Sequence, residues 1–337
     1  MPQERPLIAV FRGGYSGESV ISHQSAARLL AALDPSRYQP LFVTIERNVW
    51  SCHDAAGSEF PLDRADLSVM FEGRSRQFNA ALIAVHGPPG EDGTLQGYLD
   101  MVGVPYQTGG VLSMSMTFSK FATTAMLREQ GYHVAPSVLV RSHGQRPDPG
   151  SLELGYPCFV KPDQSGSSLG VSKVARPDDL GAALDKAFLE CDAVMIEAAV
   201  KGRELTCGVL ITDRTYTPLP VCEISTSREF FDYEAKYHAQ DTVETIPAEL
   251  PSDVTALVQQ RSVGIAKALD CKGMIRVDHF WTGSDLVTIE INTVPGFSQA
   301  SIYPKMLEVS GLGVEATLAR MVESLIVQPN SRALTHH

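Results

Sequence analysis

Short apolar runs alternate with longer amphipathic stretches over the first hundred residues. LIAVF (7–11), LFVTI (41–45) and AALIAVHG (80–87) are continuous apolar runs, which are typical of buried strands. SVISHQSAARLLAAL (19–33) and TLQGYLDMVG (94–103) place apolar residues at helical spacing. Strands that alternate with helices predict a parallel α/β sheet, whose ligand-binding loops lie at the carboxyl ends of its strands.

Strand-type runs dominate the rest of the chain. Helices are predicted from Leu112 to Gly131, over DDLGAALDKAFLE (178–190) and from Ser252 to Asp270. The β-type runs are SVLV (137–140), two strands around the loop of YPCFVKPDQSGSSLGVSKV (156–174), AVMIEA (193–198), ELTCGVLIT (204–212), PLPVCEI (218–224), GMIRVDHFW (273–281) and LVTIEIN (286–292). The change of pattern predicts domain boundaries near Gly110 and Glu197.

The charge balance narrows the possible partners. The 337 residues include 28 Lys and Arg against 39 Asp and Glu, a formal net charge of −11, which repels nucleic acids and anionic membranes. No apolar run reaches the roughly 18 residues of a membrane helix, and the N-terminus lacks the apolar region of a signal peptide. We therefore expect a cytoplasmic location. The six cysteines lack zinc-ligand spacing and are expected to be reduced core residues.

The loop GSSLG, Gly166–Gly170, is the first candidate for a functional site. Its glycines and hydroxyls would let backbone N–H groups approach phosphate oxygens, but a plain hairpin with a flexible tip is the commoner use of such a loop. The chain contains neither a P-loop nor a dinucleotide fingerprint. Lys161 ends an apolar strand beside this loop. It therefore requires either an anionic partner or a side chain that extends to water.

Two predicted strands near the carboxy terminus are the second candidate. Arg276 and Asp278 share one face of the first strand, and Glu290 and Asn292 share one face of the second. Carboxylate and amide oxygens suit Mg²⁺, whereas a solvated strand face is the alternative interpretation. The glycine-containing loop EINTVPGFSQASIYP (290–304) follows, and its N–H groups together with a nearby arginine could stabilise an oxyanion.

Six motifs together carry a family resemblance. They are GGYSGESVIS (13–22), HGPPGEDGTLQG (86–97), FVKPDQSGSSLGVSKV (159–174), EFFDYEAKY (229–237), RVDHF (276–280) and EINTVPGFS (290–298). Because these motifs occur in the family's order, the chain resembles the D-alanine–D-alanine ligases of the ATP-grasp superfamily. The resemblance implies an α/β protein in which an N-terminal parallel α/β (pre-ATP-grasp) domain precedes a two-lobed α+β ATP-grasp fold. The implied domains are residues 1–110, a small lobe at 111–196, a C-terminal lobe at 197–330 and a tail at 331–337.

The resemblance also implies a reaction. The carboxylate of a first D-alanine attacks the ATP γ-phosphate to give an acyl phosphate. The amine of a second D-alanine then attacks, and D-alanyl-D-alanine, ADP and phosphate leave. Two Mg²⁺ ions, with Mn²⁺ as a substitute, are the implied metal cofactors, peptidoglycan precursor synthesis is the implied process, and a homodimer is the implied assembly.

Site residues follow from the matched motifs. The nucleotide would contact Lys120, Lys161, Ser167, Ser168, Glu197, Ala199, Val200, Glu204 and Lys236. Magnesium would bind Asp278, Glu290 and Asn292. The two D-alanines and the reacting groups would contact Glu18, His86, Ser167, Lys236, Tyr237, Arg276, Gly296, Ser301 and Ile302.

Within this set, Glu18 would bind the ammonium of the first D-alanine and form a hydrogen-bonded triad with Ser167 and Tyr237. Without the resemblance, a helix cap would be the preferred interpretation of Glu18, and a satisfied structural histidine that of His86. Arg276 and the Gly296 N–H would form the oxyanion hole. Tyr237, a position where D-alanine–D-lactate ligases commonly have phenylalanine, favours an amine nucleophile.

Some positions depart from the commoner family pattern. They are Val20, where many relatives have glutamate, Pro88 and Pro89, Ser119, where an aspartate usually precedes the lysine, and Phe231, where some relatives have tyrosine. Two alternatives to the dipeptide ligase stay open. One is a ligase that joins D-alanine to D-lactate or D-serine, and the other is a catalytically silent nucleotide-binding protein on the same scaffold.

Overall fold

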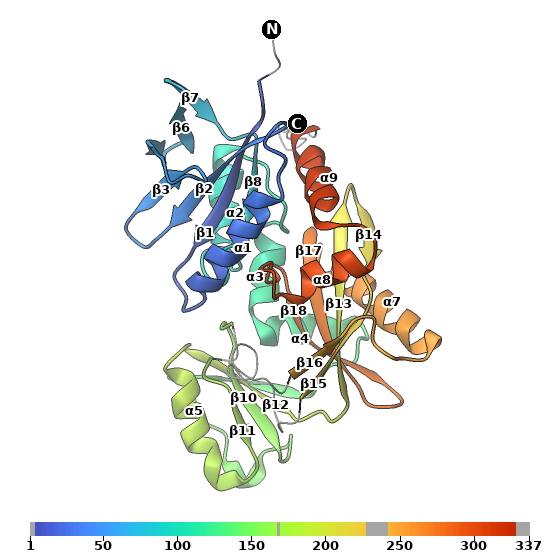
Figure 1. The fold of residues 1–337 in the computed structure, drawn as a ribbon. Coiled ribbons are helices and arrows are strands. Elements are labelled where there is room, and N and C mark those ends of the chain that lie inside the picture. Colours follow the sequence, from blue (N-terminus) through green and yellow to red (C-terminus); the bar gives the residue numbers. More distant parts are fainter. Residues whose placement is uncertain (1–3, 167–168, 227–241, 328–337) are drawn as a thin grey trace, which may run out of the picture.

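The computed structural model describes residues 4–166, 169–226 and 242–327, and three groups of elements follow one another along the chain (Figure 1). The first is a five-stranded sheet in the order β4-β3-β2-β1-β8. Its strands are β1 (Leu7–Gly13), β2 (Gln39–Ile45), β3 (Trp50–His53), β4 (Glu59–Phe60) and β8 (Ala80–Ile83). β1 is parallel to β2 and β8, as the alternating pattern predicted, whereas β3 and β4 extend the sheet antiparallel.

Alternating side chains of β1 explain why helices cover both faces of this sheet. Ile8 and Val10 are buried on the face of α1 (Ser19–Ala31), and Leu7 and Phe11 on the face of α2 (Thr94–Val102). A small antiparallel sheet, which the sequence pattern did not predict, lies beside the first. It contains β5 (Leu62–Asp63), β6 (Ser68–Phe71) and β7 (Arg74–Gln77).

The second group, the small lobe, is an antiparallel sheet in the order β11-β10-β12-β9. Its strands are β9 (Ser137–Arg141), β10 (Cys158–Pro162), β11 (Ser172–Val174) and β12 (Ala193–Ala198), and its helix is α5 (Leu180–Phe188). Short 3₁₀ helices occur at Pro149–Ser151 and Pro177–Asp179. The lobe has a hydrophobic cluster of its own, in which Leu184 of α5 is packed with Val160 and Ile196 of the sheet. In Figure 1 it lies at the bottom of the view.

The third group, the C-terminal lobe, is an antiparallel sheet in the order β16-β15-β13-β17-β18, with β14 paired to β13. Its strands are β13 (Arg203–Thr212), β14 (Thr215–Pro218), β15 (Cys222–Thr226), β16 (Thr242–Thr245), β17 (Gly273–Trp281) and β18 (Leu286–Asn292). Its helices are α7 (Ser252–Ala268), α8 (Ile302–Val309) and α9 (Val314–Val327). Ile265 of α7 packs with Val209, and Tyr303 of α8 packs with Leu210, so the helices cover opposite faces.

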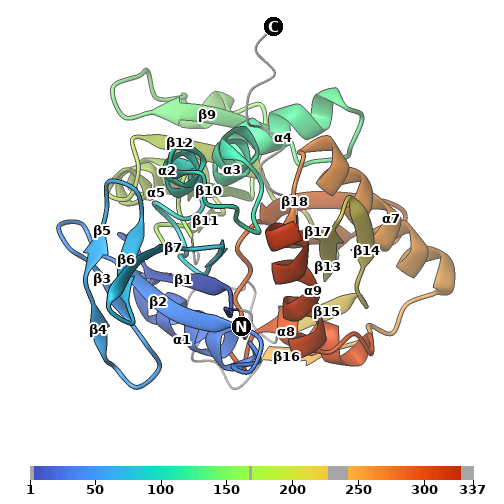
Figure 2. The same cartoon turned by 90° about the horizontal axis from the view of Figure 1, so that it is seen from above.

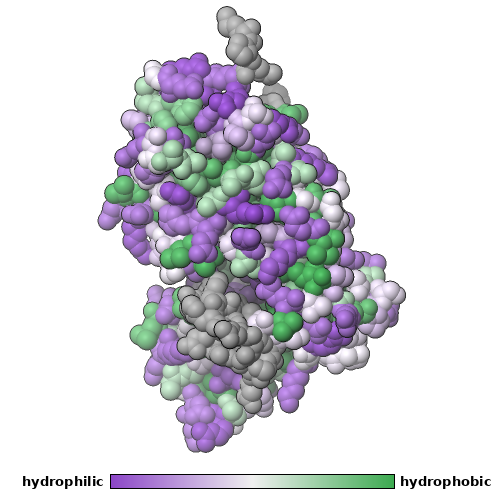
Figure 3. Space-filling model, viewed as in Figure 1, coloured by the Kyte–Doolittle hydropathy of each residue, from purple (hydrophilic) through white to green (hydrophobic). Residues whose placement is uncertain are grey.

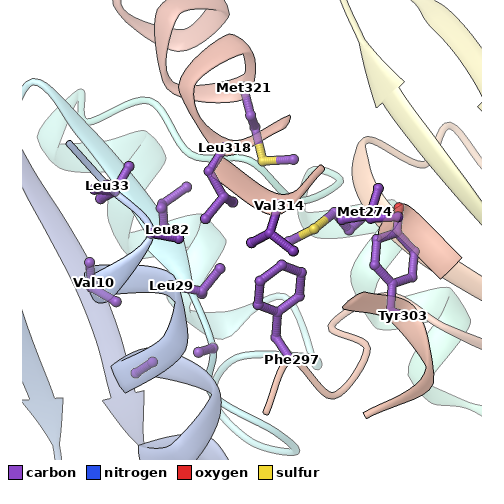
Figure 4. Packing of buried hydrophobic residues seen from close by; sticks show 14 of the residues in the cluster. Val10, Leu29, Leu33, Leu82, Met274, Phe297, Tyr303, Val314, Leu318 and Met321 are labelled. Carbon is purple, nitrogen blue, oxygen red and sulfur yellow. The ribbon is translucent and has the colours of Figure 1, made fainter. Parts of the chain in front are cut away.

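One hydrophobic cluster joins the first sheet to the C-terminal lobe. Leu29 and Leu82 lie on one side of it, and Phe297, Tyr303 and Leu318 lie on the other (Figure 4). Figure 2 likewise places α9 beside the first sheet. These two parts therefore share a core, which we call the joint core. It contains no residue of the small lobe's own cluster.

The predicted helix from Leu112 to Gly131 is wrong in one respect. The structure has two helices there, α3 (Val111–Phe118) and α4 (Lys120–Glu129). Ser119 between them is extended, with φ −85° and ψ 111°, and its hydroxyl accepts a hydrogen bond from Ala122 N. The helical periodicity continues across the break, because a serine that caps a new helix does not interrupt the apolar pattern.

The polarity of the surface and the state of the cysteines are those expected from the sequence. Hydrophilic side chains predominate on the face in Figure 3, with apolar ones scattered among them. No helix in the described ranges is both long and apolar enough to cross a membrane. All six cysteines are free thiols; Cys191 is partly exposed and the other five are buried.

Candidate active site

A cavity of about 1210 Å³ lies where the three parts of the chain meet. Most of the predicted site residues line its wall, although they come from distant motifs. They are Glu18, His86, Lys120, Lys161, Glu197, Val200, Glu204, Arg276, Asp278, Glu290, Asn292, Gly296, Ser301 and Ile302. Ala199 is not among the described wall residues, but its neighbours Ala198 and Val200 are. Ser167, Ser168, Lys236 and Tyr237 lie outside the described residues.

The paired strands β17 and β18 supply one wall of the cavity. Asp278 is opposite Glu290, and Arg276 is opposite Asn292, so the spacing in the sequence correctly placed four polar side chains together. The Arg276 guanidinium donates to both Asp278 oxygens, at 2.9 and 2.8 Å. Asp278 also accepts hydrogen bonds from Thr206 Oγ1 at 2.5 Å and from Asn292 Nδ2 at 3.0 Å. This network fixes the carboxylate that faces the cavity.

The donor atoms on this wall fit a hard divalent cation. Two carboxylates and one amide belong to adjacent strands, and since the Asn292 NH₂ group donates to Asp278, its carbonyl oxygen remains to bind a cation. In the described ranges no group of three or more His, Cys, Asp or Glu side chains forms a metal-binding arrangement. A cation here would therefore depend on the Asn292 amide and on oxygens of a bound ligand in addition to Asp278 and Glu290.

The predicted residues Lys120 and Lys161 line the cavity from outside this strand pair. Lys120 is the first residue of α4, and its Nζ lies 3.9 Å from Glu290 Oε2. Lys161, on β10, donates from Nζ to Glu197 Oε2 at 2.5 Å. The anionic partner that Lys161 requires is therefore Glu197, which is only 2% exposed and whose Oε1 has no hydrogen-bond partner in the structure. A buried acceptor without a partner, on the wall of a cavity, marks a place for a donor group of a ligand.

Glu18 immediately precedes α1, but its side chain makes no capping hydrogen bond. The structure therefore shows no hydrogen-bonded helix cap at Glu18. Its carboxylate instead lies against the Gly166 backbone, where a Cβ atom would come within 2.1 Å of Glu18 Oε2. A larger residue at position 166 would require the Glu18 side chain to move.

His86 lies behind the Glu18 side of the cavity and is 6% exposed. Its Nε2 lies 3.3 Å from Ser25 Oγ, which accepts a hydrogen bond from Phe297 N at 3.0 Å. Burial lowers the pKa of His86, although the Glu18 carboxylate acts in the opposite direction. The imidazole is therefore neutral near pH 7. Ser25, which sequence reasoning did not single out, connects His86 to the loop after β18.

That loop continues into the first turn of α8. A Cβ atom at Gly296 would come within 3.0 Å of Ser301 Oγ, and this oxygen lies 2.9 Å from Ser298 Oγ. Ser301 precedes α8 without a capping hydrogen bond from its side chain. Its hydroxyl is therefore not used by the helix, and it lines the cavity beside Ile302.

Glu91 is a site residue that the sequence did not reveal. It lines the cavity, and its Oε2 accepts a hydrogen bond from Gly87 N at 2.7 Å. Burial first, and the Glu18 carboxylate second, raise the pKa of Glu91 to about 8. At neutral pH its carboxyl group therefore carries a proton beside the Glu18 carboxylate. In the sequence it is one acid among several polar loop residues, and the distant Val294 backbone, which lowers its pKa, is among the groups that act on it.

The raised pKa of Glu91 predicts a pH-dependent stability. Between its ordinary pKa of 4.5 and the raised value of about 8, the folded chain keeps a proton that the unfolded chain has released. The free energy of unfolding therefore falls as the pH rises, by up to about 1.4 kcal/mol per pH unit, and levels off above the raised value. Urea unfolding of wild type and Glu91→Gln between pH 5 and 9 measures this. The slope is expected to flatten in Glu91→Gln and to remain in the control Asp92→Asn; equal slopes in all three proteins would refute the assignment.

Of the positions that depart from the family pattern, Val20 is on the described cavity wall and is 65% exposed. The Pro88–Pro89 peptide bond is cis, and the Pro88 carbonyl accepts a hydrogen bond from Tyr15 N at 2.9 Å. Ser119 caps α4, and Phe231 lies outside the described residues.

Comparisons with known proteins identify the family. Residues 7–109 match the family model for the D-ala D-ala ligase N-terminus, and residues 126–323 match the one for the D-ala D-ala ligase C-terminus. The D-alanine–D-alanine ligase of Phocaeicola vulgatus is 40% identical over 319 residues, 94% of this chain and 98% of that protein. The ligase of Porphyromonas gingivalis is 37% identical over 322 residues, 95% and 97% of the two chains.

Solved structures agree with this fold. A D-alanine–D-alanine ligase from Coxiella burnetii has a TM-score of 0.85 and 28% identity, and covers 98% of this chain and 96% of its own. The VanG D-Ala:D-Ser ligase from Enterococcus faecalis has a TM-score of 0.82 and 29% identity, with coverages of 96% and 100%. A Bacillus anthracis D-alanine–D-alanine ligase complexed with ATP has a TM-score of 0.78 and 29% identity, with coverages of 96% and 98%. With both family models matched and these relatives aligned over nearly its whole length, the chain belongs to the D-alanine–D-alanine ligase family.

Proposed function

We propose that this enzyme joins two D-alanine molecules at the expense of ATP and so supplies the dipeptide for peptidoglycan precursors. The carboxylate of the first D-alanine attacks the γ-phosphate, and the amine of the second displaces phosphate from the acyl phosphate. One observation carries this proposal: Lys120 and Lys161 share one cavity with the network of Arg276, Asp278, Glu290 and Asn292. Positive charge and hard oxygen donors are what a triphosphate with its cations requires.

The proposed nucleotide site lies between the small lobe and the C-terminal lobe. Lys120 and Lys161 bind phosphate oxygens, and Glu197 with the backbone near Ala199 and Val200 binds the adenine. Glu204 binds the ribose, and Ser167, Ser168 and Lys236 also contact the nucleotide. The unpartnered Oε1 of Glu197 supports its assignment, because it can accept a hydrogen bond from the adenine amino group.

Magnesium belongs to the same proposal. Asp278, Glu290 and Asn292 would hold two Mg²⁺ ions, with Mn²⁺ as a substitute. Bound there, the ions would neutralise phosphate charge as the D-alanine carboxylate approaches. The contribution of the chain is to hold Asp278 in a fixed orientation, since Arg276 and Thr206 bind both of its oxygens.

The proposed amino-acid sites occupy the other end of the cavity. Glu18, with Ser167 and Tyr237, receives the ammonium of the first D-alanine, and His86 lies near the second subsite. Ser301, Ile302 and Lys236 receive the second D-alanine. Arg276 and the Gly296 N–H stabilise the oxyanion of the tetrahedral intermediate. Support comes from Glu18 of the first motif and from Gly296 and Ser301 of the loop at 290–304, which line one cavity although they are far apart in the sequence.

The assembly and the cellular location are also proposals. We expect a homodimer in the cytoplasm that binds neither nucleic acid nor membrane, with the domain boundaries given above. Light scattering of the purified protein measures the mass of the assembly.

An assay of ADP release tests the function. ADP is measured with D-alanine alone, with D-alanine plus D-lactate and with D-alanine plus D-serine, across pH, and the products are weighed by mass spectrometry. We expect release with D-alanine alone, and D-alanyl-D-alanine as the main product. A mixed product as the main species would favour the D-lactate or D-serine ligase, and the VanG neighbour makes the latter a concrete alternative. Tight ATP binding without any ADP release would favour the silent relative.

A further inference from the structure

The break between α3 and α4 brings a residue of the small lobe to the first turn of α4. Three N–H groups of this turn lack partners within the helix, and each has a partner outside it. Lys120 N donates to Asp163 O at 3.1 Å, and Phe121 N donates to Asp163 Oδ1 at 2.8 Å. Ala122 N donates to Ser119 Oγ at 3.1 Å. Asp163 therefore completes the start of a helix to which it does not belong.

Asp163 is held firmly in this place. It follows β10 directly, is 4% exposed, and its own N–H donates to Ala193 O at 2.9 Å. Its Oδ2 accepts a hydrogen bond from Ser119 Oγ at 2.7 Å. A carboxylate at the N-terminus of a helix is also favoured by the helix dipole. Since Leu127 of α4 is packed in a cluster of the C-terminal lobe, the Ser119–Asp163 contact ties the small lobe to that lobe.

Lys120 is held at both of its ends, by Asp163 and by Ser165. Its backbone N–H is bound by Asp163, and its Nζ donates at 2.6 Å to the carbonyl oxygen of Ser165, two residues further along the chain. The ammonium group is thereby directed into the cavity, 3.9 Å from Glu290 Oε2. A long lysine side chain normally has many conformations, and here the helix start and the Ser165 carbonyl select one.

We infer that Asp163 is a positioning residue, which fixes Lys120 for the ATP phosphates through its contact with Ser119 and the first turn of α4. The inference rests on the proposed function, because Lys120 is a phosphate ligand only if ATP binds in the cavity. The contact between the two side chains joins one carboxylate to one hydroxyl. The two residues should therefore be exchangeable as a pair, although neither can be changed alone.

The test is a cycle of three variants: Asp163→Ser, Ser119→Asp and the double exchange. Asp163→Ser is expected to raise the KM for ATP by about tenfold or more, because hydrogen bonds to a charged group are lost, while kcat changes less. Ser119→Asp alone places two carboxylates in one buried contact and is expected to raise this KM further. The double exchange restores the charge balance and should return the KM to within about threefold of wild type, a non-additive result.

A matched pair in the same lobe serves as the control. Ser142 Oγ donates to Asp192 Oδ1 at 3.1 Å, and Ser142 N donates to Asp192 O at 2.9 Å. This Ser–Asp contact resembles the one under test but is exposed and lines no part of the described cavity wall. Asp192→Ser is expected to leave the KM for ATP unchanged. An equal rise in Asp192→Ser and Asp163→Ser would overturn the inference, because the effect would then be a general loosening of the lobe.

Asp163→Asn keeps the volume and one acceptor oxygen, so it provides a result if the serine variant does not fold. A smaller rise in the KM for ATP supports the inference, and an unchanged KM overturns it. Simple addition of the two single effects in the double exchange also overturns it. Wild-type turnover is measured first: no D-alanine-dependent ADP release in wild type refutes the proposed function, whereas normal wild-type turnover with insensitive Asp163 variants refutes only the positioning role.

Discussion

Replacing Glu290 by glutamine is expected to reduce turnover by about a thousandfold, because metal ions contribute several kcal/mol of charge stabilisation in reactions of this kind. Glu290→Gln removes one negative charge from the pair opposite Asp278 and hardly changes the volume. Lys120 would lose the carboxylate that lies 3.9 Å from its Nζ. Its contact with Ser165 O would remain, so the fold should be retained.

Steady-state ADP release and binding of ATP with Mg²⁺, measured by calorimetry, check this result. The exposed Glu308 on α8 provides the control, since Glu308→Gln removes the same charge away from the described cavity wall. We expect wild-type turnover in the control and an unchanged melting temperature in both variants. If Glu290→Gln turned over ATP like wild type, the assignment of the metal to this strand pair would have to be abandoned.

Truncation of Phe297 is expected to have the largest effect on stability. The ring is 1% exposed, lies 6.4 Å from the Tyr303 ring and faces the helices of both parts in the joint core (Figure 4). Phe297→Ala should lower the free energy of unfolding by about 3–5 kcal/mol, because it removes buried apolar area and leaves a cavity. It should also lower activity, since Phe297 N donates to Ser25, which contacts His86.

Urea unfolding followed by circular dichroism measures this loss. Leu189→Ala is the control, because Leu189 is 84% exposed and such surface changes are usually within about 0.5 kcal/mol. Phe297→Leu keeps much of the apolar volume and should lie between alanine and wild type. A loss below about 1 kcal/mol in Phe297→Ala would show that the two parts do not depend on the joint core.

The local pattern of apolar and polar residues was sufficient to predict most of the helices and strands. The spacing of Arg276, Asp278, Glu290 and Asn292 predicted a shared polar wall because strands alternate their side chains with a period of two, and the register confirmed it. The resemblance then gathered residues of distant motifs into one site, and the described cavity wall contains most of them. Their individual roles stay predictions.

What the sequence could not predict depends on distant contacts. Asp163, 44 residues later, accepts a hydrogen bond from Ser119 at the break between the two helices. The helical periodicity gives no sign of such a partner. The short strands β5 to β7 have too little apolar alternation to be recognised. Glu91 owes its raised pKa to burial and then to the Glu18 carboxylate, which is distant in the sequence, whereas the residue type alone predicts only the ordinary pKa of a glutamate.

The joint core has a consequence for the order in which the chain becomes stable during synthesis. Val10, Leu29 and Leu82 form an apolar face that is completed by Phe297 and Leu318. The ribosome makes these last two only after the small lobe and the whole C-terminal sheet. Until then the apolar side chains of α1 and the first sheet that face this core are exposed to water, a state that invites chaperone binding or aggregation. The small lobe, with its separate cluster, can fold as soon as it emerges.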